Sequence, residues 1–243
     1  MNINLHYGKP ESYDYSTLLD QLSGTNVKSI KTSSIPLAEF WKETNNRLSG
    51  LINHLNLFPN SNVQLCFEYP TSPKQGKGKA SMTDLMVLYG DTKIAIEAKF
   101  SEYKKMDDEQ IGDWLKENPD NRKKVLSYWD SLIFPFTKGI EENEKMKIDY
   151  QFYHRTASAC YQSQKAFVIY QLFYDDETLP YLDNFVKKLE GYKSIINPTD
   201  MLRYFVWKVK TNLLRSDINK NDAFYLMKTE KVYEFTDSHL VEI

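Results

Sequence analysis

Two short stretches of the sequence carry side chains that could perform hydrolytic chemistry together. Asp84 follows Thr83, and Glu97-Ala98-Lys99 comes after twelve intervening residues, in the pattern D-x12-E-x-K. Two carboxylates held close together repel each other unless a cation lies between them, and hard divalent ions such as Mg²⁺ or Mn²⁺ prefer such oxygen ligands. A neighbouring lysine can orient or deprotonate an attacking water, and it can stabilise the charge that builds on a phosphorane. The pattern therefore indicates a site for phosphodiester cleavage.

The residues around Glu97 predict a strand over 93–100. Side chains alternate between the two faces of a strand, so one face of this strand is an unbroken apolar row that must point to the core: Ile94, Ile96, Ala98 and Phe100. Glu97 and Lys99 consequently point together to the opposite face.

The length of the turn before this strand decides whether the two carboxylates meet. If Gly90-Asp91 forms a two-residue turn, the residue opposite Asp84 is Glu97. A four-residue turn would place Lys99 opposite Asp84, and either register leaves the three side chains on one face with opposed Cβ atoms ~5 Å apart. A three-residue turn would place Ala98 there and destroy the cluster.

The pattern of apolar, turn-forming and polar residues predicts an α/β (α+β) protein, with a central mixed sheet flanked by helices in a single domain over 1–243. The expected elements are a helix at 36–57, strands at 63–69, 82–89 and 93–100, a helical insertion at about 105–150, a helix at 155–164, a strand at 165–174, a helix at 179–189 and edge strands within 223–235. The segment 203–210 fits either a helical or a strand period, Pro70 is expected to end the strand 63–69, and the Gly- and Lys-rich segment 71–80 is expected to be a mobile basic loop.

Composition narrows the classes of protein to which the chain can belong. The formal net charge of the 243 residues is −2 and the pI is about 6.1, so DNA binding would need a local basic strip rather than a broad positive surface. No apolar stretch is long enough to span a membrane, and residues 1–10 do not resemble a secretory signal. Two cysteines are too few for a disulfide framework or a four-cysteine zinc site, which favours a cytoplasmic location.

The motif and its flanking elements resemble the PD-(D/E)xK nuclease superfamily (restriction endonuclease-like proteins). The resemblance rests on Asp84 in one strand, a tight turn, and Glu97-Ala98-Lys99 in the next strand, and it covers about half of the chain. Thr83 stands where the name of the motif has proline. The resemblance implies a core of helix, three-stranded meander, helix and a further strand, and Mg²⁺-dependent hydrolysis of DNA.

The resemblance also implies secondary site residues. Superfamily members often add an acid from the first helix, here Glu39 or Glu43, or from the first strand, here Glu68. Many place a glutamine or a basic residue on the helix before the fourth strand. Gln162 is the choice there, because i, i+7 spacing places it on the face of Arg155.

The resulting expectation is a metal-dependent endonuclease acting on DNA. Asp84 and Glu97 would bind Mg²⁺ or Mn²⁺ together with Glu43 or Glu68. Lys99 would assist the attacking water. The protein is also expected to be able to form a homodimer. The alternatives are a non-catalytic DNA-binding or assembly protein on the same fold, or an α/β protein with a surface ion-pair cluster. Contact with the phosphate backbone is expected from three lysines of the loop: Lys74, Lys77 and Lys79.

Overall fold

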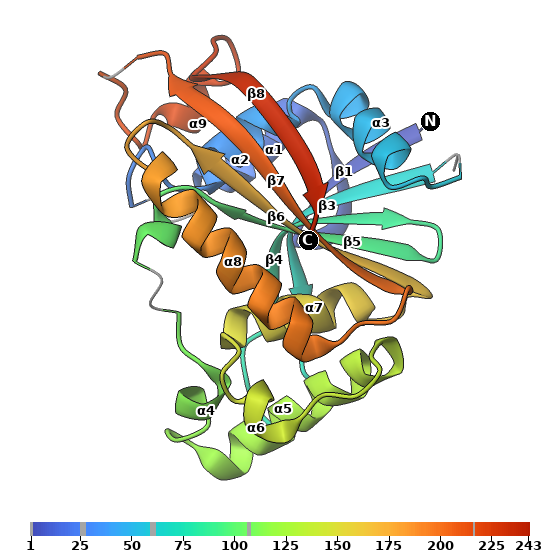
Figure 1. Cartoon of the computed structure of the whole chain (residues 1–243). Helices are drawn as coiled ribbons and strands as arrows, with labels where there is room; N and C mark the ends of the chain where they lie inside the picture. The colour runs from blue at the N-terminus through green and yellow to red at the C-terminus, as the bar shows by residue number, and fades with distance from the viewer. Residues whose placement is uncertain (1, 25–27, 59–61, 106–107, 216) are drawn as a thin grey trace.

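A mixed β-sheet runs through the molecule, and helices cover both of its faces (Figure 1). The computed structural model describes residues 2–24, 28–58, 62–105, 108–215 and 217–243. Within these residues eight strands lie in the order β2-β1-β3-β4-β5-β6-β7-β8. The strands are β1 (Asn2–Tyr7), β2 (Lys9–Tyr13), β3 (Asn62–Thr71), β4 (Ser81–Tyr89), β5 (Thr92–Lys99), β6 (Lys165–Tyr174), β7 (Leu202–Leu213) and β8 (Tyr233–Glu242).

The sheet combines an antiparallel meander with a parallel unit. β3, β4 and β5 pair antiparallel in sequence order, whereas β5, β6 and β7 pair parallel. β1 is parallel to β3, and the edge strands β2 and β8 are antiparallel to their neighbours. Parallel strands are normally buried on both faces, and β6 is accordingly an almost unbroken apolar run. The expected α/β class with a central mixed sheet is confirmed.

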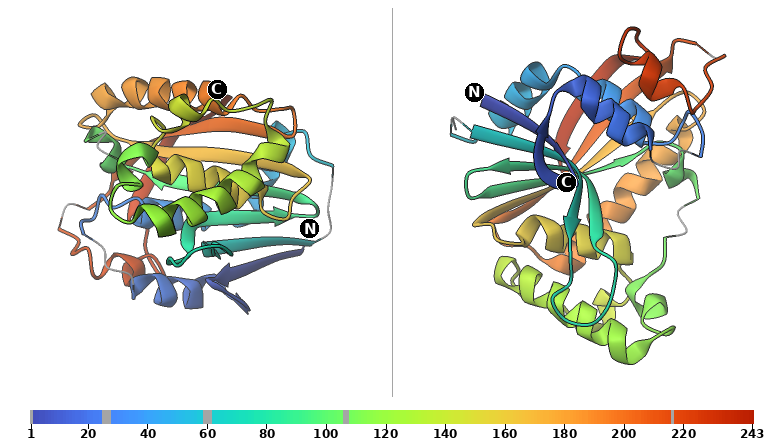
Figure 2. Two further views of the ribbon diagram at one scale, coloured as in Figure 1. Left: turned by 90° about the horizontal axis from the view of Figure 1, so that it is seen from below. Right: turned by 180° about the vertical axis from the view of Figure 1, so that it is seen from behind.

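Helices lie on both faces of the sheet, and on the second face they are stacked two deep (Figure 2). The first face is covered by α1 (Tyr15–Ser23), α2 (Ser34–Trp41), α3 (Thr44–His54) and α9 (Ala223–Leu226). On the second face α7 (Tyr150–Cys160) and α8 (Leu179–Ile196) pack against the strands. α5 (Pro119–Ile133) packs on α7, α6 (Glu142–Lys145) packs on α8, and α4 (Ile111–Trp114) belongs to the same apolar cluster. Each face has its own apolar core, so alternate residues of one strand belong to different cores.

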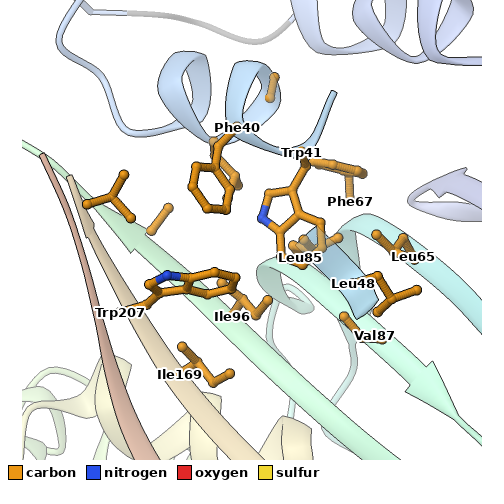
Figure 3. Packing of buried hydrophobic residues seen from close by; sticks show 14 of the residues in the cluster. Phe40, Trp41, Leu48, Leu65, Phe67, Leu85, Val87, Ile96, Ile169 and Trp207 are labelled. Carbon is orange, nitrogen blue, oxygen red and sulfur yellow. The ribbon is translucent and has the colours of Figure 1, made fainter. Parts of the chain in front are cut away.

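Aromatic side chains fix α2 on the first face (Figure 3). The Phe40 ring meets the Trp207 ring edge-on, with centroids 5.1 Å apart, and Trp41 meets it at 6.0 Å. The indole N–H of Trp41 donates to Oε1 of Gln171 on β6 at 3.1 Å, which satisfies a buried donor. This packing places α2, and its acid Glu39, on the first face.

The hairpin of β4 and β5 has the two-residue turn predicted from Gly90-Asp91. Tyr89 is paired with Thr92, and the ladder continues to Leu85 opposite Ile96. Gly90 has a φ of 60°, a conformation that suits glycine in such turns. The prediction of the turn is confirmed.

Several predicted boundaries are wrong. The helix at 36–57 is divided into α2 and α3, because Glu43 has a non-helical backbone with φ −84° and ψ 48°. β3 continues through Pro70, which is paired with Met82; the ladder between β3 and β1 has already ended at Phe67, so the missing N–H of Pro70 breaks no bond there. The segment 223–235 contains the short helix α9 and only the start of an edge strand, β8.

Other segments agree more closely with the sequence. The predicted helix at 179–189 forms the first part of α8, and 203–210 lies within β7. The helical insertion contains α4, α5 and α6, although residues 106–107 within it lie outside the described residues. The strands and helix of the first 24 residues, β1, β2 and α1, are additions to the predicted elements. Among the described residues no helix is both long and apolar enough to cross a membrane.

Candidate active site

Asp84 and Glu97 lie side by side on the second face of the sheet. The ladder of β4 and β5 ends at the pair Leu85–Ile96, so the next residues along the two strands are these two acids. The strands separate there, and Oδ2 of Asp84 accepts the backbone N–H of Ala98 at 2.8 Å. The register expected for a two-residue turn is therefore present.

Glu97 is the centre of a buried network in which each carboxylate oxygen has a partner. Its exposed fraction is 2%. Oε2 accepts from Nε of Arg155, while Oε1 accepts from Nε2 of Gln151 at 2.8 Å and lies 3.4 Å from Nζ of Lys99. Lys99 also donates to Oε1 of Gln151 at 2.6 Å. The amide of Gln151 thus bridges the carboxylate and the ammonium group and fixes their relative positions.

Helix α7 supplies Gln151 and Arg155, and its position corrects the prediction of Gln162. The predicted helix at 155–164 begins earlier, at Tyr150, and ends at Cys160. Gln162 is exposed in the following turn, with a left-handed φ of 52°, and does not join the cluster. The i, i+4 spacing of Gln151 and Arg155, which places both on one helix face, is the sequence signal that would have found them.

Arg155 is held in place by a second set of contacts. Its Nη1 donates to Oγ of Ser81 at 2.7 Å, and Oγ of Ser81 lies 2.7 Å from Nδ1 of His154. Burial and the charges of Arg155 and Lys99 lower the pKa of His154 well below its usual value, so the imidazole is neutral. Because Arg155 is the donor to Ser81, the hydroxyl proton of Ser81 is directed to Nδ1 of His154.

Glu68 is the additional acid that the structure brings near the cluster. It has a left-handed φ of 49°, and the β3–β4 ladder passes from Phe67–Leu85 to Tyr69–Thr83 without a pair at Glu68. Burial raises the pKa of Glu68, with opposite contributions from Arg155, which lowers it, and Glu97, which raises it. Left-handed backbone at a non-glycine residue costs of order 1 kcal/mol or more and is concentrated at functional sites.

Glu43 and Glu39 are not brought to the cluster. Glu43 is exposed before α3, 3.9 Å from Arg47, and Glu39 of α2 is buried where it accepts the N–H of Val232 at 3.3 Å. Both acids belong to the first face, whereas Asp84 and Glu97 face the second. The sheet therefore separates them from the site.

The pKa values of Asp84 and Lys99 are set by burial and by the charged groups enclosed with them. Burial and the neighbouring charge of Glu97 raise the pKa of Asp84 well above its usual value, although Arg155 and Lys99 oppose this. For Lys99, burial favours the neutral form, but the carboxylates of Glu97 and Asp84 outweigh it and raise its pKa. Lys99 is thus held in its cationic form, whereas burial beside Glu97 favours the protonated form of Asp84.

A metal ion at this site would be held by oxygen ligands, and the residues fit that requirement in type. The charge of Glu97 raises the pKa of both Asp84 and Glu68, and carboxylates are the ligands that Mg²⁺ prefers. Throughout the described ranges, however, no group of three or more His, Cys, Asp and Glu side chains is arranged to hold a metal ion. A cation that binds Glu97 would have to compete with Arg155 and Gln151 for its oxygens.

The segment 71–80, for which the sequence predicts a mobile basic loop, is hydrogen-bonded to α5. The backbone N–H of Lys77 donates to Oδ1 of Asn121, and Nδ2 of Asn121 donates back to the carbonyl of Lys77, each at 2.7 Å. At Gly76, with a φ of 76°, a Cβ atom would lie 2.8 Å from Val125, so glycine is required at this contact. The three loop lysines are exposed, and the loop lies against the end of α5 that carries Arg122, Lys123 and Lys124.

Comparisons with known proteins give a family but no activity. A family model described as "Domain of unknown function (DUF6946)" matches residues 16–213. No curated protein and no solved structure matches the chain. The match extends from α1 to the end of β7 and therefore includes every residue of the cluster around Glu97.

Proposed function

The chain belongs to the DUF6946 family, whose function is unknown, and from the geometry of its site we propose that it is a metal-dependent nuclease that hydrolyses phosphodiester bonds in DNA. The observation that carries the proposal is the arrangement of Asp84, Glu97 and Lys99 on one sheet face, next to Gln151 and Arg155 of α7. The order of helix, meander, helix and strand around them is consistent with a restriction endonuclease-like core.

Each group has a part in this proposed reaction. Asp84 and Glu97, with Glu68 beside them, would hold Mg²⁺ or Mn²⁺, which supplies charge stabilisation at a phosphate oxygen and lowers the pKa of a bound water. Lys99 remains protonated because of its carboxylate neighbours, so its role is to orient the water and stabilise negative charge rather than to remove a proton. Gln151 fixes the direction of the Lys99 ammonium group through their 2.6 Å hydrogen bond.

The test of this proposal is cleavage by the purified full-length protein. Plasmid, linear, branched and single-stranded DNA are incubated with Mg²⁺, with Mn²⁺ and with a chelator, beside an Asp84→Asn variant. Cleavage that needs the metal and Asp84 supports the nuclease. If no substrate is cut, the second candidate, a non-catalytic DNA-binding or assembly protein, takes precedence; the engagement of both Glu97 oxygens by protein groups is the observation that favours it.

Metal binding should depend on pH in a direction fixed by Asp84. Because its pKa is raised, the carboxyl is protonated up to a higher pH than usual and must lose that proton when a cation binds there, so we expect metal affinity to fall as the pH is lowered through that pKa. Calorimetric titration with Mn²⁺ in two buffers of different ionisation enthalpy measures the proton release. Asp84→Asn should abolish both binding and release, and an equal response of the two proteins would contradict the site.

The same raised pKa predicts the effect of Asp84→Asn on the metal-free protein. A carboxyl with a raised folded-state pKa destabilises the fold as the pH rises above the unfolded value of about 3.8, and the cost vanishes below it. The variant should therefore be more stable than wild type at neutral pH and should lose this advantage in acid. Thermal denaturation as a function of pH measures the difference, and a variant less stable at neutral pH would refute the argument.

The basic loop should contribute to DNA affinity without reading sequence. Replacement of Lys74, Lys77 and Lys79 by alanine should weaken binding similarly for all sequences. It should also flatten the dependence of log K on log salt by up to ~0.9 for each phosphate that the loop no longer neutralises. Fold stability should barely change, because the side chains are exposed. Fluorescence anisotropy at several salt concentrations measures the slope.

A matched control removes three exposed lysines elsewhere: Lys138, Lys187 and Lys231. This variant has the same net charge as the loop variant, so a change confined to the loop variant identifies the DNA path. An equal slope in both variants would show that the loop does not contact DNA, and Lys123 and Lys124 of α5 would be tested next.

A further inference from the structure

A cavity of about 460 Å³ lies on the first face of the sheet, on the side away from Asp84 and Glu97. It opens between the end of α2, the start of α3 and the first residues of β8, and part of its wall is aromatic. A hollow of this size with a few charged groups is the usual form of a small-ligand site. The charged side chains around it are three carboxylates and three cationic groups: Glu39, Glu43, Glu234, Lys42, Arg47 and Lys231.

Glu39 brings to this cavity a carboxylate whose charge has no close partner. The residue is 6% exposed, and its Oε2 accepts the backbone N–H of Val232 at 3.3 Å. It forms no ion pair with any described residue, because the ammonium group of Lys42 donates instead to the carbonyl of Met227 at 2.7 Å. Burial raises the pKa of Glu39, and the more distant charges of Lys42 and Lys231 oppose this only in part. A cationic group beside the carboxylate would remove this cost of burial.

Oε1 of Glu39 is the atom that can receive such a group. Several buried side-chain atoms in the described part of the chain, such as Nε2 of Gln171, are enclosed and lack a hydrogen bond, but Oε1 of Glu39 is not among them. Because Oε1 accepts no hydrogen bond from a described residue either, it must border open space. Glu39 lines this cavity, so an N–H donor of a bound ligand can reach Oε1 from it.

Arg47 supplies the opposite charge close by. Its guanidinium lies 4.0 Å from the ring centroid of Phe40, the residue that follows Glu39. The side chain is 26% exposed, and its ion pair with Glu43 is long, at 3.9 Å, to a carboxylate that is itself 56% exposed. An exposed pair of this kind contributes little free energy, so the guanidinium remains able to bind a second carboxylate.

We propose that this cavity binds a free α-amino acid, with its ammonium group at Oε1 of Glu39 and its carboxylate at Arg47. The ligand has one charge of each sign on neighbouring atoms and no net charge, which matches a lining of three acids and three bases. Phe235, half-buried at the start of β8, offers an apolar surface to the side chain of the ligand. The inference does not rest on the proposed nuclease function, because the sheet separates this cavity from Asp84 and Glu97.

Binding is tested first with the full-length wild-type protein. Thermal denaturation in the presence of each common amino acid, at millimolar concentration, identifies the one that raises the Tm most, and calorimetry compares it with its N-acetyl and carboxamide forms. We expect each blocked form to bind at least about tenfold more weakly, because each leaves one charge of the site without its partner. If no amino acid raises the Tm, or if the blocked forms bind as tightly as the free one, the proposal is overturned.

Two variants then assign the two ends of the ligand. Glu39→Gln keeps the shape of the side chain and the acceptor for Val232, and it should lose the preference for the free amino acid over the N-acetyl form. Arg47→Met should lose the preference over the carboxamide form instead. Each variant should bind the free amino acid about tenfold more weakly than wild type.

Glu190→Gln is the matched control, since it makes the same change at an exposed acid of α8 on the second face. It should bind the amino acid as wild type does. Thermal denaturation without ligand checks that the three variants are folded. Wild-type affinity in Glu39→Gln, or an equal loss of affinity in Glu190→Gln, would refute the assignment of the ammonium group to Glu39 and with it the proposed site.

Discussion

Lys99→Met is expected to abolish metal-dependent DNA cleavage while leaving the fold intact. Removal of a single charge-stabilising donor from an enzyme site typically lowers the rate by about 10²–10³-fold. Methionine matches most of the length of lysine, and this matters because Lys99 is only 8% exposed and alanine would leave a cavity. Single-turnover nicking of plasmid measures the rate, and thermal denaturation measures the fold.

Lys93→Met is the matched control for this experiment. Lys93 lies on the same strand and the same face as Lys99, has the same exposed fraction of 8%, and lies over the rings of Tyr69 and Tyr161 at 5.5 and 4.9 Å. Its replacement removes a second buried lysine of this face without touching Glu97 or Gln151, and because burial lowers the pKa of Lys93 to about 8, the comparison is made at pH 7, where Lys93 is mostly charged. Cleavage should persist in Lys93→Met, and an equal loss in both variants would mean that Lys99 has no special role.

The sequence predicted the site best where its residues lie close together along the chain. Asp84, Glu97 and Lys99 are separated only by one hairpin, and strand alternation together with Gly90-Asp91 determines their register. β6 was recognisable for a similar reason, since a long apolar run bounded by polar residues has few other interpretations.

The rest of the site depends on contacts that no local pattern contains. The predictions for Glu39 and Glu43 are wrong because helical periodicity does not reveal which face of a distant sheet a helix covers. In the structure the packing of Phe40 and Trp41 against Trp207 places this part of the chain on the first face. Gln162 was chosen because the start of α7 was placed five residues late, which hid the pair Gln151 and Arg155. Helix boundaries are the least predictable part of a helix.

Burial of the sheet face that carries Glu97 and Lys99 is the feature with the largest consequence for the free energy of unfolding. The alternation of β5 predicts that Glu97 and Lys99 share a face, and one alternative from the sequence is a surface ion-pair cluster on that face. α7 covers it instead, so Glu97 is 2% exposed and needs the guanidinium of Arg155. An ion pair of this kind is necessary to the fold in a way that a surface pair is not.

Arg155→Met is accordingly expected to lower the free energy of unfolding by about 3–5 kcal/mol, because it leaves the Glu97 charge buried without its strongest partner. For a chain of this size the loss corresponds to a fall in Tm of roughly 6–20 °C. The double variant Arg155→Met with Glu97→Gln should recover part of the stability, since both charges are then absent, and denaturant unfolding of the four proteins gives the coupling energy.

The effect of Mn²⁺ on thermal stability distinguishes a cation site at this ion pair from a purely structural role. In wild type a cation must compete with Arg155 for Glu97, whereas in Arg155→Met it can take the place of the guanidinium beside Glu97 and lower the pKa of Asp84 as Arg155 does. Mn²⁺ should therefore raise the Tm of Arg155→Met by more than that of wild type, and the added Asp84→Asn substitution should remove the gain. If Mn²⁺ stabilises Arg155→Met no more than wild type, the acids do not form a cation site, and the cluster serves only to hold α7 against the sheet.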